Sequence, residues 1–222
     1  MRGCRLETNE AMRLAGKTEP KELHLTARFT RAADYARSIH IERRKGTGIP
    51  YMSHLLGVAS LVMGEAGHGG LTVTEDMVIA ALLHDAAEDH GGLRRLEDIE
   101  ANFGANVARM VEGLSDTLAE DSNHKEEWEV RKQRYLDRLR NEPEDVRLIS
   151  AADKLYNARA VLADYREIGG KVWERFKRGR KEQMWYFKSL IEVFKSFEGN
   201  RIVGELDRVV AELEREIAGK EA

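Results

Sequence analysis

The stretch VIAALLHDAAED, residues 78–89, places polar side chains directly after an apolar run. Residues 78–83 are typical of the buried face of a helix, so the polar residues that follow lie at the edge of a core. Glu88 follows His84 by four residues and Asp89 follows Asp85 by four, which puts each pair on a shared helix face. Carboxylates packed this closely repel one another and lose water, a cost that a bound cation would offset. The pattern therefore predicts one continuous helix over residues 74–89 with a cation site at its end.

Two further polar residues stand in apolar surroundings. His54 lies near the start of the predicted helix MSHLLGVASLVM, and Asp153 is flanked by apolar residues in ISAADKLYNAR, where a carboxylate needs a partner. Two imidazoles and two carboxylates suit a borderline or hard cation such as Mn²⁺, Fe²⁺ or Zn²⁺, which polarises phosphate and acidifies water. His54, His84, Asp85 and Asp153 are therefore predicted metal ligands, and hydrolysis of a phosphorylated molecule is the leading hypothesis.

The composition limits the class of protein. A chain of 222 residues is long enough for one domain with a helical appendage, and its formal charge of −3 argues against a general nucleic-acid binder. The single cysteine, Cys4, excludes an intrachain disulfide and fits a reducing compartment. We find neither a secretory signal nor a stretch of roughly 20 apolar residues. A cytoplasmic protein that binds neither nucleic acid nor membranes is expected.

Helical spacing of apolar residues dominates the chain, which contains only 3 prolines, and this predicts an all-α fold. We expect an N-terminal tail over residues 1–23, a main helical domain over 24–165 and C-terminal helices over 166–222 that pack on it. Helix starts are predicted at Thr26, Pro50, Thr74 and Pro143, with short helices at 95–104 and 105–115. The segment 121–140 is predicted to be a largely exposed, charged helix, and two amphipathic helices are predicted over 173–197 and 201–219.

Four segments, in their order along the chain, resemble the hydrolase domain of the RelA/SpoT homologue family of HD metal-dependent phosphohydrolases. They are RRKGTGIPYMSHLLGVA, VIAALLHDAAED, LEDIEANFGANVARMVEGLS and ISAADKLYNAR. The resemblance implies an HD-domain helical bundle with a C-terminal helical extension. The family removes the 3′ pyrophosphate from guanosine tetra- and pentaphosphate, using Mn²⁺ held by two histidines and two aspartates. Because no room for the family's synthetase domain remains after residue 165, the chain resembles a stand-alone small alarmone hydrolase.

The resemblance also implies roles for individual residues. Glu88 and Asp89 fall on the family's Glu-Asp pair beside the metal, which would activate or orient the attacking water and handle protons. Arg44 and Lys45 fall on a basic pair that holds the nucleotide, and Asn157 falls on a nucleotide-contacting asparagine. The implied reaction is attack of water on the ribose-proximal phosphorus, with pyrophosphate leaving and no phosphoenzyme.

Two features depart from the family pattern. His90 stands where a threonine is common, and a loop residue is favoured over an extra proton carrier. The segment 171–190 combines six basic residues between Lys171 and Lys181 with Trp185 and Tyr186, a combination that could cover phosphates and a ribose or base. Tyr186 is the better candidate for substrate contact because its hydroxyl needs a polar partner.

Two alternatives stay open at this point. The first is an HD phosphohydrolase acting on an adenosine alarmone, a nucleoside monophosphate or the 2′ phosphate of NADPH, because the metal ligands contact only phosphate. The second is a catalytically silent nucleotide-sensing module, which predicts the loss of a ligand or of the Glu-Asp pair, and these residues are all present. Fe²⁺, Co²⁺ and Zn²⁺ are alternatives to Mn²⁺, and no oligomeric state is predicted.

Overall fold

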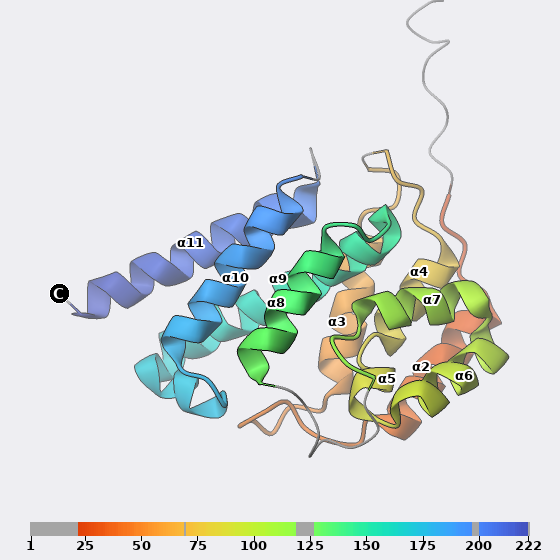
Figure 1. The fold of residues 1–222 in the computed structure, drawn as a ribbon, viewed down its shortest axis with the longest axis horizontal. Helices are drawn as coiled ribbons and strands as arrows, with labels where there is room; N and C mark the ends of the chain where they lie inside the picture. The colour runs from red at the N-terminus through yellow and green to blue at the C-terminus, as the bar shows by residue number, and fades with distance from the viewer. Residues whose placement is uncertain (1–21, 69, 119–126, 197–199, 222) are drawn as a thin grey trace, which may run out of the picture.

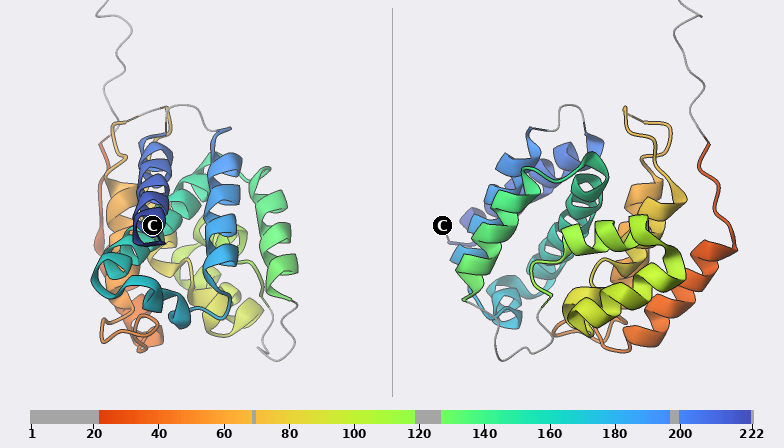
Figure 2. Two further views of the ribbon diagram at one scale, coloured as in Figure 1. Left: turned by 90° about the vertical axis from the view of Figure 1, so that its left-hand side faces the viewer. Right: turned by 45° about the vertical axis from the view of Figure 1, so that its right-hand side comes forward.

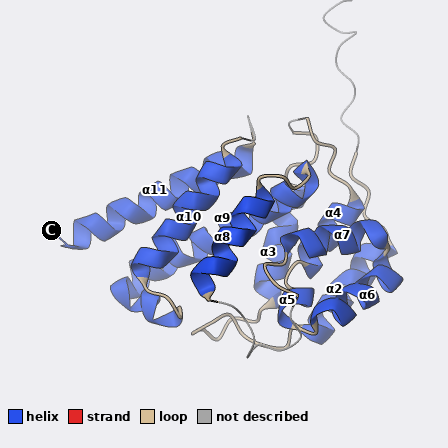
Figure 3. Ribbon diagram, in the orientation of Figure 1, coloured by secondary structure: helices blue, strands red, loops and turns tan. Residues whose placement is uncertain are grey.

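The computed structural model describes residues 22–68, 70–118, 127–196 and 200–221, so most of the expected N-terminal tail, with Cys4, lies outside the described residues. Within these ranges all regular elements are helices (Figure 3), and one isolated β-bridge joins Arg43 to Pro50. The expected all-α fold is confirmed. The elements are α2 (Ala27–Ile39), α3 (Met52–Met63), α4 (Glu75–Leu83), α5 (Ala86–Asp89), α6 (Gly92–Phe103), α7 (Ala105–Leu114), α8 (Trp128–Leu139), α9 (Glu144–Ile168), the 3₁₀ helix η2 (Gly169–Arg175), α10 (Arg180–Phe194) and α11 (Arg201–Glu221).

Side-chain caps start two helices at the residues that the sequence predicts. The Thr26 hydroxyl accepts a hydrogen bond from the Arg28 N–H at 3.1 Å, and the Thr74 hydroxyl accepts one from the Met77 N–H at 3.3 Å. The backbone N–H of Thr26 also donates to Glu75 Oε1 at 2.6 Å. The starts of α2 and α4 are therefore held next to each other.

The prediction of one continuous helix over residues 74–89 is wrong, because a turn at His84 and Asp85 separates α4 from α5. The break is slight, because both residues keep right-handed helical dihedral angles, with φ −59° and ψ −32° at His84 and φ −93° and ψ −7° at Asp85. His84 Nε2 and Asp85 Oδ2 lie 3.0 Å apart. Gly91, with φ +109°, then lets the chain turn sharply into α6.

A second departure concerns the segment 173–197, which was predicted to be one helix. Gly169, with φ +61°, ends α9, and the chain continues as η2 and then as irregular bends over residues 176–178 before α10 begins. The boundary that we proposed after residue 165 falls within the last turn of α9.

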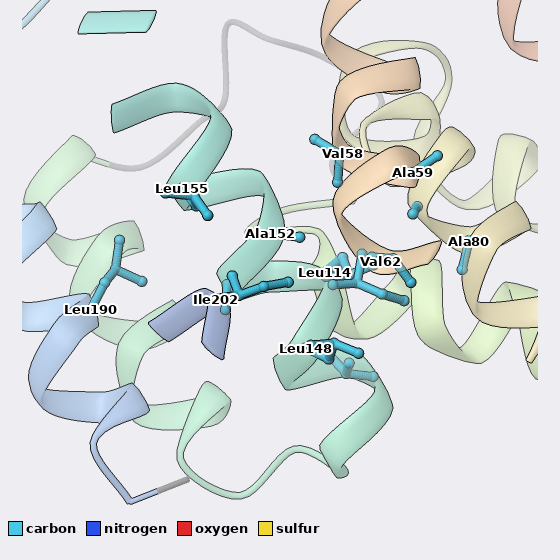
Figure 4. Packing of buried hydrophobic residues seen from close by; sticks show 14 of the residues in the cluster. Val58, Ala59, Val62, Ala80, Leu114, Leu148, Ala152, Leu155, Leu190 and Ile202 are labelled. Atoms are coloured by element: carbon cyan, nitrogen blue, oxygen red, sulfur yellow. The ribbon is translucent and has the colours of Figure 1, made fainter. Parts of the chain in front are cut away.

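Helix α9 lies in the middle of the molecule (Figures 1 and 2). It contacts α3, α4 and α7 of the N-terminal part as well as α10 and α11 of the C-terminal part. Figure 4 shows part of the core around α3, with the buried residues Val58 and Val62 of α3 and Ala152 of α9, while Ala59 lies on the side of α3 toward Ala80 of α4. The buried residues Leu190 and Ile202 extend this core toward α10 and α11.

Among the described residues, no helix has both the length and the apolar character needed to cross a membrane.

Candidate functional site

Four donor atoms meet where α3, α9 and the turn between α4 and α5 come together. His54 Nε2 and His84 Nε2 lie 3.1 Å apart. Asp85 Oδ2 is 3.0 Å from the His84 nitrogen and 3.4 Å from the His54 nitrogen. Asp153 Oδ1 is 3.3 Å from the His54 nitrogen and 3.7 Å from the His84 nitrogen. The fold thus brings together the four side chains that the sequence predicts as metal ligands.

This donor set fits a divalent cation. His84 Nδ1 donates to the Ala81 carbonyl at 2.8 Å, which leaves the Nε2 lone pair directed at the cluster. Burial disfavours protonation of His84, but the charges of Asp85 and Asp153 outweigh burial and hold its pKa well above the usual range. The carboxylates therefore require positive charge between them, and a bound cation would supply it in place of the imidazolium proton.

Close packing of α3 against α9 places His54 opposite Asp153. Gly57 lies one turn after His54, and a Cβ atom on Gly57 would lie only 2.0 Å from Cε2 of Tyr156 in α9. At the start of α3, the Tyr51 hydroxyl donates to Asp85 Oδ2 at 2.6 Å. The missing side chain at Gly57 therefore sets the distance between the two helices that carry the donors.

The four donors open into a small polar pocket with a volume of about 130 Å³. Pockets that enclose a whole small-molecule ligand have volumes of roughly 300–1,000 Å³, so this one is suited to a phosphate group while the rest of a larger ligand stays outside. Its lining consists of Tyr51, His54, His84, Asp85, Glu88, Leu114, Asp116, Lys132, Tyr135, Asp153, Lys154, Asn157 and Tyr186.

Glu88 faces this pocket beside a second carboxylate, Asp116. Glu88 Oε2 accepts a hydrogen bond from the Asp116 backbone N–H at 3.0 Å, and Asp116 forms ion pairs with Arg131 and Lys132, both at 2.7 Å. Burial and the charge of Asp116 raise the pKa of Glu88 to about 8. Burial opposes ionisation of Asp116 as well, but Lys132 and its other hydrogen-bond partners lower the pKa of Asp116 to about 2. Near neutral pH, therefore, Glu88 holds a proton and Asp116 is charged.

Asp89, the second member of the predicted Glu-Asp pair, lies elsewhere. It is exposed as the last residue of α5, and it is not part of the pocket lining. The structure therefore brings Glu88 to the pocket and leaves Asp89 outside it.

Two lysines bring positive charge to the pocket. Lys154 donates to Asp153 Oδ2, and Lys132 Nζ lies 5.1 Å from the centre of the Tyr186 ring. The Tyr186 hydroxyl is buried and has no hydrogen-bond partner in the described part of the chain. Because an unpaired buried hydroxyl costs free energy, this group is available to donate to a ligand oxygen.

The predicted nucleotide-binding residues are divided between the pocket and the surface. Asn157 donates from Nδ2 to Asp153 Oδ1 at 2.6 Å, and its Oδ1 accepts from Arg44 Nη2 at 2.6 Å. The Arg44 guanidinium also lies 5.7 Å from the centre of the Tyr51 ring. Lys45 is exposed in the loop between α2 and α3 and does not line the pocket. Asn157 thus lines the pocket, Arg44 contacts two lining residues from outside it, and Lys45 lies on the surface.

Sequence reasoning missed Tyr51, Asp116, Lys132 and Lys154 of this lining. Lys132 lies in α8, whose many charges predict a solvated helix and give no sign that one lysine turns inward. Lys154 directly follows Asp153 in an apolar run, and that adjacency was a usable signal. Asp116 lies outside any helix and carries no comparable signal.

Comparison with known proteins places the chain in a family. The HD domain family model matches residues 32–183. The mouse protein named guanosine-3′,5′-bis(diphosphate) 3′-pyrophosphohydrolase MESH1 is 36% identical over 175 residues, which cover 78% of this chain and 86% of the mouse protein. The human protein of the same name is 31% identical with the same coverage. A guanosine-3′,5′-bis(diphosphate) 3′-pyrophosphohydrolase of Aquifex aeolicus (strain VF5) is 33% identical over 72% of this chain, but over only 20% of its own length.

The fold of this chain also matches solved structures. One, described as a metazoan ortholog of SpoT that hydrolyzes ppGpp, matches with a TM-score of 0.64 and 26% identity, covering 85% of this chain and 97% of the other. The protein lmo0812 from Listeria monocytogenes EGD-e matches with a TM-score of 0.58 and 31% identity, covering 71% of this chain and 96% of the other. The expected HD-domain fold is confirmed. The chain therefore belongs to the HD-domain family and is homologous to MESH1 and the SpoT/RelA hydrolase domains.

Proposed function

We propose that this protein is a metal-dependent phosphohydrolase that releases pyrophosphate from the 3′ position of guanosine 3′,5′-bis(diphosphate). The observation that carries the proposal is the group of four donor atoms, with contacts of 3.0–3.7 Å, on the wall of a phosphate-sized pocket. The MESH1 relatives, which are named for this reaction, match most of the chain. Two carboxylates beside two imidazoles favour Mn²⁺ as the resident metal.

His54, His84, Asp85 and Asp153 would hold the cation, which when bound polarises phosphate and lowers the pKa of water. A water oxygen bonds to the phosphorus attached to the ribose 3′ oxygen, the bond between that phosphorus and the 3′ oxygen breaks, and the 3′ oxygen gains a proton. The products are GDP and pyrophosphate. Glu88 holds a proton near neutral pH and is the residue that we assign to proton exchange, with Asp89 proposed to assist from the end of α5.

The remaining lining residues would bind the substrate. Lys132 and Lys154 would balance the negative charge of the diphosphate, and the unpaired Tyr186 hydroxyl would donate to one of its oxygens. The nucleoside would stay outside the small pocket, near Arg44 and Asn157, with Lys45 on the adjacent loop. Because such nucleotides are dissolved in the cytoplasm, we propose that the protein acts there.

Product analysis tests this function. Metal-stripped protein, resupplied with Mn²⁺, is incubated with guanosine tetraphosphate, and GDP and pyrophosphate are followed by ion-exchange chromatography. We expect both products at equal rates and no turnover without metal. Asp153→Asn should lose bound metal and activity together, whereas Glu88→Gln should keep the metal and lose turnover by a factor on the order of 10² or more. His68→Gln, a change at an exposed histidine outside the pocket, serves as the control.

Other products would change the proposal. Release of orthophosphate, or turnover of an adenosine alarmone or NADPH in place of guanosine tetraphosphate, would keep the metal chemistry and replace the substrate. Tight binding of guanosine tetraphosphate by the metal-loaded protein without turnover would indicate a nucleotide sensor.

A further inference from the structure

A second group of metal-ligating side chains lies outside the pocket. His40 directly follows α2, Glu42 lies two residues further along the loop, and His90 directly follows α5. Nδ1 of His40 is 2.8 Å from Glu42 Oε1, and Nε2 of His90 is 3.4 Å from the same oxygen. One donor atom from each of the three residues lies within 4.8 Å of the other two. The spacing resembles that of the first cluster, where neighbouring donors are 3.0–3.7 Å apart.

Hydrogen bonding accounts for only part of this arrangement. Oε1 of Glu42 can accept a hydrogen bond from each of the two imidazoles, but Oε2 of the same carboxylate is buried with no hydrogen-bond partner in the described part of the chain. The two rings are close, with centroids 4.6 Å apart and planes at 86°. A cation between the nitrogens and the carboxylate would use the lone pairs of all three groups and would also be within reach of the second carboxylate oxygen.

One of the three side chains is fully buried and the other two are partly exposed, which holds the donors in place and still lets an ion enter from solvent. The His40 side chain is fully buried and stacks on the Tyr51 ring, with centroids 5.1 Å apart. Burial lowers the pKa of His40, so its imidazole is neutral near pH 7, which is the form that binds metals. Glu42 and His90 keep 36% and 31% of their side-chain surface exposed, which leaves a path for an ion from solvent.

We propose that His40, Glu42 and His90 form a second divalent-cation site, separate from the first, for a borderline ion of the Zn²⁺ or Co²⁺ class. Two imidazoles and one carboxylate make a softer donor set than that of the first cluster and favour such ions over Mn²⁺. Tyr51 separates the two sites, because its ring stacks on His40 while its hydroxyl donates to Asp85. A bound ion would join the loop that carries Arg44 to the end of α5, next to Glu88 and Asp89.

Zinc counting tests the proposal. Tag-free, metal-stripped protein is brought to equilibrium by dialysis against micromolar Zn²⁺, and the zinc bound per chain is measured by mass spectrometry. The deciding quantity is the difference in zinc bound per chain between wild type and either Glu42→Gln or His90→Gln. This difference does not depend on how much zinc the first cluster holds. We expect each variant to bind one zinc fewer than wild type, and His68→Gln to match wild type.

The first cluster provides an independent reference. Asp153→Asn should keep the zinc that His90→Gln loses, and the double variant should bind less than either single variant. Equal zinc content in wild type, Glu42→Gln and His90→Gln, with unchanged far-ultraviolet circular dichroism, would overturn the proposal. Crystals soaked in Zn²⁺ give a second test, because an anomalous peak is expected between His40, Glu42 and His90, and zinc at the first cluster alone would also overturn it.

Discussion

At the scale of a single residue, Glu88 lines the pocket and has a strongly raised pKa. Burial and the charge of Asp116 raise its pKa to about 8, compared with about 4.3 for an ordinary glutamate. The folded chain therefore holds this proton more tightly than the unfolded chain. The resulting contribution to stability is complete below about pH 4 and is lost as the pH rises through about 8.

We therefore expect the unfolding free energy of the metal-free protein to fall between pH 5 and pH 8.5. In Glu88→Gln this decrease in unfolding free energy should be smaller than in wild type by on the order of 2 kcal/mol, because a neutral amide does not ionise. Urea unfolding at the two pH values, with chelator present, measures the difference. Glu97→Gln, at an exposed position of α6, should keep the wild-type fall. An equal fall in Glu88→Gln and wild type would show that Glu88 ionises normally.

The sequence locates some site residues better than others for a physical reason. His84, Asp85 and Asp153 stand in or beside apolar runs, where a polar side chain is conspicuous because burying it without a partner is costly. Lys132 could not be found in this way, because it is surrounded by other charges in α8. Its inward direction depends on contacts with Asp116 and Tyr186 from distant segments.

At the scale of the helices, the crossing of α3 and α9 determines how close His54 comes to Asp153. Gly57→Ala would place Cβ 2.0 Å from the Tyr156 ring, so the ring or the helices must move. We expect a loss of stability of about 1–3 kcal/mol and at least tenfold weaker binding of metal at the first cluster. Thermal unfolding and metal titration measure the two effects.

Gly204→Ala is the matched control, because its Cβ would meet no atom within 4 Å in the first turn of α11. There alanine should raise stability by at most about 1 kcal/mol through helix propensity and leave metal binding unchanged. Wild-type metal affinity in Gly57→Ala would mean that the interhelical distance does not control the cluster.

The helices themselves could largely be predicted, because caps and apolar spacing are local. Thr26 and Thr74 cap α2 and α4 as expected. The break at His84 and Asp85 could not be predicted, because both residues keep dihedral angles compatible with a helix and the break depends on partners in α3 and α9. Tertiary contacts override local preference at the site itself.

At the scale of the whole molecule, α9 belongs to both proposed parts of the chain, because it contacts α3 and α7 as well as α11. Leu206 of α11 is fully buried in this shared core. Leu206→Ala should therefore destabilise the whole protein by about 2–5 kcal/mol and shift a single calorimetric transition to lower temperature. Leu93→Ala removes the same atoms from a leucine that is 55% exposed and should change stability by about 0.5 kcal/mol or less.

The shape of the transition tests how the C-terminal helices are joined to the rest. If α10 and α11 unfolded independently, Leu206→Ala would shift one of two transitions and leave the other in place. A single transition is expected because removing α11 would expose the face of α9 that it covers, and α9 also carries Asp153. Saturating Mn²⁺ should then raise the midpoint of that one transition in Leu206→Ala as it does in wild type, since the ion binds only the folded chain. Stabilisation of only one of two transitions by the metal would show that the C-terminal helices fold without the site.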